Sequence, residues 1–379
     1  MYDLLIKDGM IVDPSQGLNG PADIAFLDGK VAAISPSISD SEATDVLDAT
    51  DLIVTPGLID LHVHNFWGVS HYGIDPDTTN IANGVTTAVD AGSAGAATFP
   101  AFRRYVLERA DTRLYALLNI SLTGMISRTI GELEDLRHAD VAQAVRIGRQ
   151  NWDYILGIKA RLSDMITRQH DVDSLKRAVE AAEALDAFVM IHVGFTKTPM
   201  EDLVAMLRPG DVVTHSFHGN AHGILDDTGK VKDAFPEHQR RGIVFDIGHG
   251  AGSFSFEVAE KAMADGFNPG NISSDLHFYN IEGPVFDQVT TISKFMWLGM
   301  SLFDVVRLTT SETAKTMGVD DRLGTLKVGA VGDATILRLD EGKFTFTDSY
   351  GKSVTSRQKL NHVKTIKDGR VYKPWLRGT

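Results

Sequence analysis

The chain contains no cysteine among its 379 residues. Disulfide bonds and thiolate metal sites are therefore excluded, and any metal ion has to be bound by histidine, a carboxylate or a modified side chain. A metal site built from these residue types is of the hard, hydrolytic kind.

The sequence also lacks an excess of positive charge and any long apolar run. Its net charge is −13, which argues against a nucleic-acid partner because phosphate binding requires a positive surface. The N-terminus has no basic region followed by an apolar stretch, and no uninterrupted apolar segment is long enough to cross a bilayer. We therefore expect a cytoplasmic protein with a small-molecule substrate and no nucleic-acid or membrane partner. A homo-oligomer is compatible with this composition.

Both ends of the chain predict short β-strands separated by turns. Near the N-terminus, apolar runs alternate with Asp8-Gly9 and Asp28-Gly29, and Asp-Gly between such runs is a strong hairpin signal. Residues 365–372 are similar in sequence to residues 5–12. We therefore predict one small β-sandwich domain formed by both chain ends, residues 1–54 and 324–379, with a second domain inserted at residues 55–323.

The inserted segment alternates short apolar runs with helical spacing, which is typical of βα units and a parallel sheet. Helices are expected at residues 173–187 and near residues 302–318. Eight strands favour an α/β architecture of the (β/α)8 TIM-type barrel, and the chain is long enough for such a barrel plus a smaller domain. The predicted strands cover residues 58–64, 85–90, 114–121, 155–162, 188–193, 212–217, 243–248 and 271–275.

The first barrel strand follows a Pro56-Gly57 turn and ends in two histidines, His62 and His64. Because side chains alternate faces along a strand, the two imidazoles point the same way and lie close enough to share one metal ion. Among 13 histidines, one such pair is weak evidence by itself. Its position at the end of a buried strand is what favours a metal site.

Other predicted strands also end in residues that bind metals, and in a (β/α)8 barrel the chemistry sits at these ends. Taken singly, His192 and His215 are better interpreted as hydrogen-bonded core histidines, and Asp275 as a helix N-cap. Lys159 is harder to dismiss, because a lysine inside an apolar strand is normally expelled or paired. Taken together, four imidazoles, one lysine and one carboxylate at one barrel mouth favour a metal centre.

These residues resemble the amidohydrolase superfamily of metal-dependent hydrolases. The resemblance covers essentially the whole chain, including the segment Pro56-Gly57-Leu58-Ile59-Asp60-Leu61-His62-Val63-His64 and the pair Ser274-Asp275. It is strongest toward the amidohydrolase/deacetylase or dihydroorotase-like branch, on Thr214-His215-Ser216-Phe217-His218-Gly219 and Asp246-Ile247-Gly248-His249-Gly250.

The resemblance implies a centre of two divalent metal ions, usually zinc. By position, His62 and His64 would bind one ion together with Asp275, and His192 and His215 would bind the other.

The resemblance further implies that Lys159 is carboxylated by CO2 and that its carbamate bridges the two ions. The chemistry agrees, because burial near cations lowers the pKa of a lysine and the neutral amine can add CO2. A water between the ions would ionise near neutral pH and attack a polarised carbonyl, with Asp275 as general base and then acid. The reaction implied is hydrolysis of an amide or an ester.

Substrate contacts are less clearly indicated by the sequence. Arg161 lies two residues beyond Lys159 and would either clamp a substrate carboxylate or form a salt bridge to a neighbouring loop, and the two interpretations weigh about equally. His218 and His249 are further candidate substrate contacts, although loop histidines are more often polar rim residues.

The substrate class follows from one departure from the family pattern. Dihydroorotases typically carry an arginine two positions after the second histidine, whereas Asn65 and Phe66 follow His64 here. We therefore favour deacylation of an N-acyl or O-acyl amino or hydroxy acid, and hydrolysis of a cyclic amide stays open.

Two alternative functions are a one-metal deaminase and a non-catalytic scaffold. A one-metal deaminase would not need Lys159 as a bridge. A non-catalytic scaffold would tend to lose metal ligands, whereas all the expected positions are filled.

Overall fold

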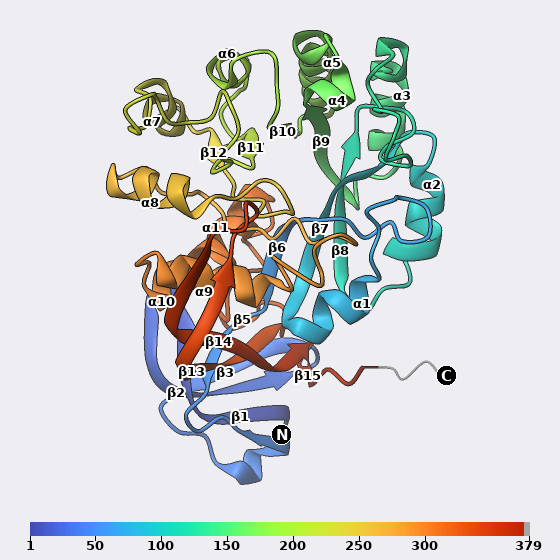
Figure 1. Ribbon diagram of the computed structural model, residues 1–379. Helices are drawn as coiled ribbons and strands as arrows, with labels where there is room; N and C mark the ends of the chain where they lie inside the picture. Colours follow the sequence, from blue (N-terminus) through green and yellow to red (C-terminus); the bar gives the residue numbers. More distant parts are fainter. Residues whose placement is uncertain (375–379) are drawn as a thin grey trace.

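The computed structural model describes residues 1–374, and two β-sheets organise this part of the chain (Figure 1). The first sheet has eight strands in the order β15-β14-β13-β5-β1-β2-β3, with β4 paired to β1. The second has seven strands in the order β12-β11-β10-β9-β8-β7-β6. No helix in the described part of the chain is long and apolar enough to cross a membrane.

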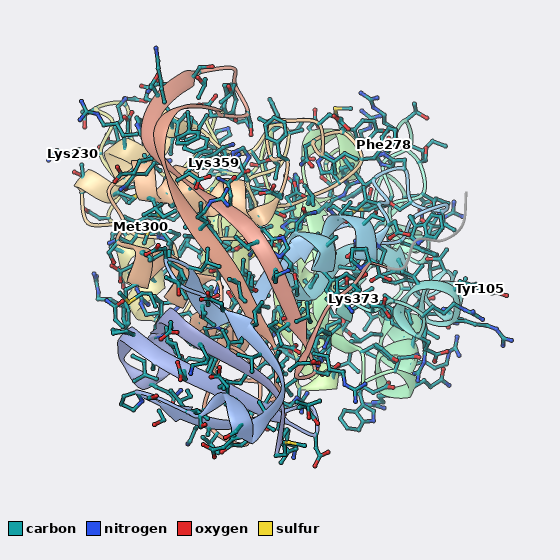
Figure 2. The ribbon with its side chains drawn as sticks, turned by 90° about the horizontal axis from the view of Figure 1, so that it is seen from below. Tyr105, Lys230, Phe278, Met300, Lys359 and Lys373 are labelled. Carbon is teal, nitrogen blue, oxygen red and sulfur yellow. The ribbon has the colours of Figure 1, made fainter. Side chains whose placement is uncertain are left out.

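The first sheet joins the two ends of the chain, because β13 pairs antiparallel with β5. In Figure 1 the blue N-terminal and red C-terminal strands lie side by side, and Figure 2 shows the two long strands β13 and β14, with Lys359 on β14. The strands are β1 (Tyr2–Asp13), β2 (Leu18–Leu27), β3 (Lys30–Ser35), β4 (Ala43–Asp48), β5 (Ile53–Pro56), β13 (Ala334–Thr347), β14 (Ser353–Lys367) and β15 (Arg370–Val371). The boundaries of the two domains and the sandwich form of the smaller one stay predictions, and residues 375–379 lie outside the described residues.

The Asp-Gly pairs of the first sheet form two different structures. Asp28-Gly29 connects β2 to β3 in a hairpin, as predicted. Asp8-Gly9 does not, because β1 continues through it and pairs with β2 on both sides, with a shift of register between Ile6 and Gly9. Asp8 adopts a left-handed φ of 57°, so the extra residue is absorbed in a β-bulge. The predicted hairpin at Asp8-Gly9 is therefore wrong.

The second sheet is parallel throughout and curls as the predicted TIM-type barrel requires. Its strands are β6 (Leu58–Val63), β7 (Val85–Gly95), β8 (Arg113–Asn119), β9 (Ile155–Leu162), β10 (Phe188–Val193), β11 (Val212–Thr214) and β12 (Val244–Phe245). All side chains of β6 and β7 are buried, because one face fills the barrel and the other packs under surrounding segments.

The segment expected to form the eighth strand, residues 271–275, closes the barrel without forming a regular strand. Two isolated parallel bridges flank it, one from Asn271 to Asp246 and one from Val63 to Leu276. The segment therefore lies between β12 and β6. Asp275 adopts a left-handed φ of 49°, which is incompatible with an extended ladder. The predicted position is right, and the predicted regular strand is wrong.

Helices connect the barrel strands and begin or end close to the predicted positions. The predicted helix at 173–187 is α5, and the predicted helix near 302–318 is split into α10 and α11. The helices are α1 (Pro76–Thr79), α2 (Phe99–Phe102), α3 (Val141–Gln150), α4 (Asp164–Thr167), α5 (Asp171–Leu185), α6 (Met200–Ala205), α7 (Ala234–Arg240), α8 (Phe256–Ala264), α9 (Gln288–Trp297), α10 (Leu302–Leu308) and α11 (Ser311–Thr316).

One buried carboxylate joins the two sheets. Asp333, just before β13, accepts hydrogen bonds from Arg113 on β8 and from Lys367 on β14, the latter at 3.3 Å. It also accepts from the backbone N–H of Asp368 at 2.9 Å. The barrel and the sheet of the chain ends are thus linked through Asp333.

We expect Asp333→Ala to lower the free energy of unfolding by about 2–3 kcal/mol, because two partly buried cations lose their shared buried partner. Urea denaturation measures this change. As a control, Asp40→Ala removes the exposed partner of Lys7 and should shift the midpoint far less. Equal losses in the two variants would contradict the linking role of Asp333.

Candidate metal centre and active site

The structure brings the predicted ligands together at the C-terminal end of the barrel. The Nε2 atoms of His62 and His64 lie 3.3 and 3.1 Å from Asp275 Oδ1. The ring of His215 lies 5.1 Å from that of His62 and 4.3 Å from that of His192. One atom each from His62, His215 and Asp275 fall within 4.8 Å of one another, a grouping able to hold a metal ion.

The tautomer of His62 is fixed by its neighbours. Its Nδ1 lies 2.9 Å from Thr214 Oγ1, and the Thr214 hydroxyl donates its proton to Asp246 Oδ2 at 2.7 Å. The hydroxyl oxygen therefore accepts from Nδ1–H of His62. The unprotonated Nε2 of His62 is left facing Asp275, which is the arrangement that a metal ligand requires.

His215 provides the test of whether a metal ion fits. Its Nδ1 lies 2.6 Å from the carbonyl oxygen of Gly248, and a carbonyl only accepts, so Nδ1 carries the proton. Its Nε2 is buried and has no hydrogen-bond partner among residues 1–374. An unsatisfied buried nitrogen costs about 1–3 kcal/mol unless something binds it. With imidazole and carboxylate atoms converging on it, a divalent cation fits this position.

Burial keeps the imidazoles neutral. Burial, followed by the nearby charge of Lys159, holds the pKa of His62 and of His64 well below its ordinary value. Burial likewise lowers the pKa of His192 and brings the pKa of His215 to about 3. A neutral imidazole offers a lone pair, so these histidines are in the state that binds metal.

Lys159 lies entirely inside the barrel, near these imidazoles. Burial lowers the pKa of its amine to about 7, and Nζ donates to the sulfur of Met190 at 3.3 Å, a weak acceptor. Gly92 on β7 makes room for the side chain, because a Cβ at this position would lie 2.6 Å from Lys159 Cβ. The structure therefore holds a lysine that can lose its proton near neutral pH.

Asp60 positions His62 and the segment of Asp275 together. Its Oδ1 accepts from the backbone N–H of His62 at 3.2 Å and of Ser274 at 3.0 Å. Burial raises the pKa of Asp60 to about 7 and also raises the pKa of Asp275. One carboxylate thus fixes the backbone of two ligand-bearing segments that are distant in sequence.

A pocket of about 300 Å³ opens outward from these ligands. Its wall combines aromatic rings, two arginines and backbone from the loops after β10, β11 and β12. Besides the predicted ligands His62, His64, His192 and Asp275, the lining residues are Tyr72, Arg128, Arg161, Gly194, Phe195, Asn220, Ala251, Gly252, Ser253, His277 and Tyr279.

The predicted substrate contacts lie in different places. Arg161 lines the pocket and also forms a bidentate pair with buried Glu132, at 2.6 and 2.7 Å, so the salt-bridge interpretation describes its present partner. His218 and His249 are not among the lining residues. His218 Nδ1 accepts from the backbone N–H of Asn220, and His249 Nε2 accepts from Lys294 Nζ at 2.7 Å.

Sequence reasoning missed the residues that orient the ligands. Thr214 fixes His62, and Ser93 lies 2.9 Å from Nδ1 of His64. Single hydroxyls carry no spacing signal, and only the position of Thr214 beside His215 at a strand end could have indicated its role. Arg128 and Tyr279 were also missed, because they lie on loops with no periodic pattern.

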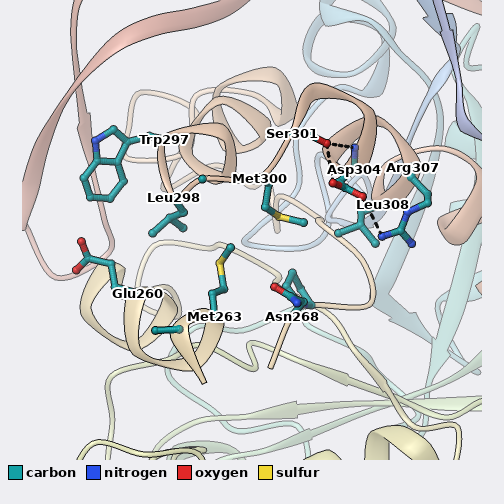
Figure 3. A pocket seen from close by; sticks show the side chains of 13 residues that line it. Glu260, Met263, Asn268, Trp297, Leu298, Met300, Ser301, Asp304, Arg307 and Leu308 are labelled. Atoms are coloured by element: carbon teal, nitrogen blue, oxygen red, sulfur yellow. Dashed lines mark hydrogen bonds and ion pairs between the residues drawn. The ribbon is translucent and has the colours of Figure 1, made fainter. Parts of the chain in front are cut away.

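A larger hollow of about 780 Å³ lies elsewhere, between α8 and the connection from α9 to α10 (Figure 3). Met263, Trp297 and Met300 line it, together with Ser301, Asp304 and Arg307, which are linked to one another. None of the predicted metal ligands lines this hollow. The predicted metal ligands therefore open onto the smaller pocket at the barrel mouth.

Known proteins similar to this chain include enzymes of several stated activities. A deacetylase from Enterococcus faecalis is 34% identical over 375 residues, covering 98% of this chain and 99% of its own. A crystal structure described as an adenine deaminase superposes with a TM-score of 0.92 at 34% identity, covering 99% and 100% of the two chains. A crystal structure of a dihydroorotase superposes with a TM-score of 0.90 at 32% identity, covering 97% and 98%.

The family model described as "Amidohydrolase family" matches residues 277–372. The full-length similarity to the deacetylase extends the match over nearly the whole chain, and the barrel superposes on both solved structures. The barrel mouth also holds a group of residues able to bind a metal ion. This chain therefore belongs to the amidohydrolase family of hydrolytic enzymes.

Proposed function

We propose that this chain is a binuclear metal-dependent hydrolase that removes the acyl group from an N-acyl or O-acyl amino or hydroxy acid. The observation that carries the proposal is the buried, unpartnered Nε2 of His215 beside His62 and Asp275. In this proposal the barrel domain spans residues 55–323, and residues 1–54 and 324–379 form the small β-sandwich domain.

The ligands divide between two sites in this proposal. His62 and His64 would hold one ion with Asp275, His192 and His215 would hold the other, and a carbamate on Lys159 would bridge both. Divalent ions, usually zinc in the family, supply Lewis acidity toward a carbonyl oxygen and lower the pKa of a water molecule.

The protein's own residues supply the proton transfers. Asp275 lines the pocket and lies against two neutral imidazoles, where it can accept a proton from water and return it to the leaving nitrogen or oxygen. Lys159 Nζ, whose pKa lies at about 7, can add CO2 through its neutral amine and release a proton, which turns a cation into an anion. Both steps depend on the burial of the site.

Arg128 is the better candidate to hold a substrate carboxylate. The charge of Arg161 is already matched by Glu132, whereas Arg128 is exposed at the pocket and lies over the ring of Tyr279 at 4.9 Å. A planar guanidinium binds a carboxylate through two parallel hydrogen bonds. The acid group of the substrate would thus sit at the outer end of the pocket and the acyl bond at the ligands.

A cyclic amide substrate is the alternative. The similarity to a solved dihydroorotase supports it, and the absence of an arginine two positions after His64 opposes it.

The deciding experiment is a hydrolysis screen of N-acetyl amino acids, O-acetyl hydroxy acids, dihydroorotate and succinimide. The enzyme is grown with bicarbonate and reconstituted with zinc. If only the cyclic amides are hydrolysed, the cyclic amidohydrolase function replaces the deacylase proposal. If the protein binds about two metal ions per chain and hydrolyses none of these compounds, a non-catalytic scaffold is favoured.

We expect ¹³C-bicarbonate to label one lysine per chain as a carbamate, visible by ¹³C NMR, and Lys159→Ala to lose both the signal and bound metal. Lys294→Met is a matched control, because burial also lowers the pKa of Lys294 to about 7 but its Nζ is bound to His249 and two carbonyls. A signal that survives in Lys159→Ala would show that Lys159 is not the modified residue.

Asp275→Asn should reduce kcat by about 10²–10⁴-fold, because an amide cannot accept the proton from water. Metal content, measured by plasma mass spectrometry, should be retained through the imidazoles. Unchanged turnover with intact metal would remove the proton-transfer role from Asp275.

Arg128→Met should raise KM for an acetylated acid by about 10–100-fold and leave KM for its methyl ester unchanged, because only the acid has the charge that Arg128 binds. Steady-state kinetics on the pair of substrates measures this. Arg104→Met is the matched control, since Arg104 also lies over a tyrosine, Tyr105, but outside the pocket. Equal effects on acid and ester would argue against a carboxylate contact at Arg128.

A further inference from the structure

The turn between β13 and β14 reaches from the sheet of the chain ends to the mouth of the barrel. Ser349 donates its backbone N–H to the carbonyl of Phe254 at 3.0 Å and its hydroxyl to the carbonyl of Gly250 at 2.9 Å. Asp348 Oδ2 accepts from the backbone N–H of Phe256, the first residue of α8, at 3.0 Å. The turn is therefore bonded to the loop that follows β12.

The hydroxyl of Tyr350, in the same turn, joins two loops of the pocket wall. It accepts from the backbone N–H of Gly219 at 2.8 Å, and it lies 3.0 Å from the carbonyl of Gly252 and 3.2 Å from Asn220 Oδ1. A phenol has one proton, so it donates to one of these two oxygens at a time. Asn220 follows β11 and Gly252 follows β12, and both line the pocket.

The approach of the ring to this wall depends on the absence of a side chain at Gly219. A Cβ there would lie 3.2 Å from Cζ and 3.3 Å from Cε2 of Tyr350, which is tighter than ordinary contact. The turn itself is held by Asp348 Oδ1, which accepts from the backbone N–H groups of Tyr350 and Lys352, both at 2.9 Å. Ring direction and hydroxyl position are thus both determined by the turn.

We propose that Tyr350 is a positioning residue that holds the pocket wall of Asn220 and Gly252 from outside the barrel. The residue does not touch the reacting atoms; it acts through the two loops that it joins. Its kinetic consequence rests on the proposed hydrolase function, and its effect on the loops does not. Tyr350, in the β13–β14 turn of the sheet of the chain ends, therefore helps to determine how a substrate fits the pocket.

Hydrogen–deuterium exchange on the full chain tests the effect on the loops without a substrate. Tyr350→Phe keeps the ring and removes the hydroxyl, so exchange over 217–222 and 250–254 should become about threefold to tenfold faster. Exchange over 271–277 and the metal content should not change. Tyr105→Phe is the matched control: Tyr105 is exposed and lies at the periphery in Figure 2, and its variant should match the wild type throughout.

A second variant separates the two loops. Ser349→Ala removes only the hydroxyl bonds of Ser349 to the loop after β12 and keeps its backbone bond to Phe254. Exchange should therefore rise over 250–254 and stay unchanged over 217–222. Unchanged exchange over both loops in Tyr350→Phe would overturn the proposal. A uniform rise that includes 271–277 would also overturn it, because the hydroxyl would then contribute to general stability alone.

Kinetics supply the functional readout. For the acetylated acid turned over fastest in the screen, Tyr350→Phe should raise KM about threefold to tenfold with kcat changed less than about twofold, because the wall contacts substrate and not the reacting bond. A loss confined to kcat would contradict the positioning role. If no acid is turned over, the proposed function fails and the exchange result still decides the role of Tyr350.

Discussion

The metal site depends on how the protein binds the Nδ1 atoms of its buried histidines, because those bonds decide where each Nε2 points. Thr214, Ser93 and the Gly248 carbonyl bind the Nδ1 atoms of the three histidines they contact, His62, His64 and His215. Burial keeps these rings neutral, and Nε2 of His62 and His64 lies close to Asp275. Imidazole lone pairs and a carboxylate that converge on one point fit a divalent cation, so the orientation of the rings determines what the site can bind.

The barrel is built to maintain that orientation. Asp60 and Asp246 are buried carboxylates, and burial raises the pKa of each. Asp60 accepts hydrogen bonds through both oxygens, from backbone N–H groups of His62 and Ser274 and from the Ser274 hydroxyl. Asp246 accepts through Oδ2, from the hydroxyls of Thr214 and Ser273. Their hydrogen bonds replace the regular ladder that is absent at residues 271–275. The turn between β13 and β14 supports the pocket from outside the barrel. Buried carboxylates therefore hold the base of the pocket, and this turn of the sheet of the chain ends holds its mouth.

Much of this arrangement could be predicted from the sequence, and the remainder had no local signal. The His62-x-His64 spacing after an apolar run predicts two imidazoles on one face at the end of a strand. Lys159 is recognisable because an apolar strand does not normally carry a lysine. The eighth strand was mispredicted as regular because nothing in the sequence of residues 271–275 indicates the left-handed φ of Asp275. The pairing of Arg161 with Glu132 and the contacts of Tyr350 with Gly219 join residues far apart in the chain, and no periodicity encodes such contacts.

In the proposed site, Nε2 atoms and carboxylate oxygens from separate strands would face a pair of metal ions. Anomalous diffraction at the zinc absorption edge, on crystals of zinc-reconstituted protein, tests it most directly. We expect two anomalous peaks about 3.5–4 Å apart, one beside His62 and His64 and one beside His192 and His215, with density for a carbamate on Lys159 between them. Peaks at other positions, or imidazoles turned so that Nδ1 faces the pocket, would contradict it.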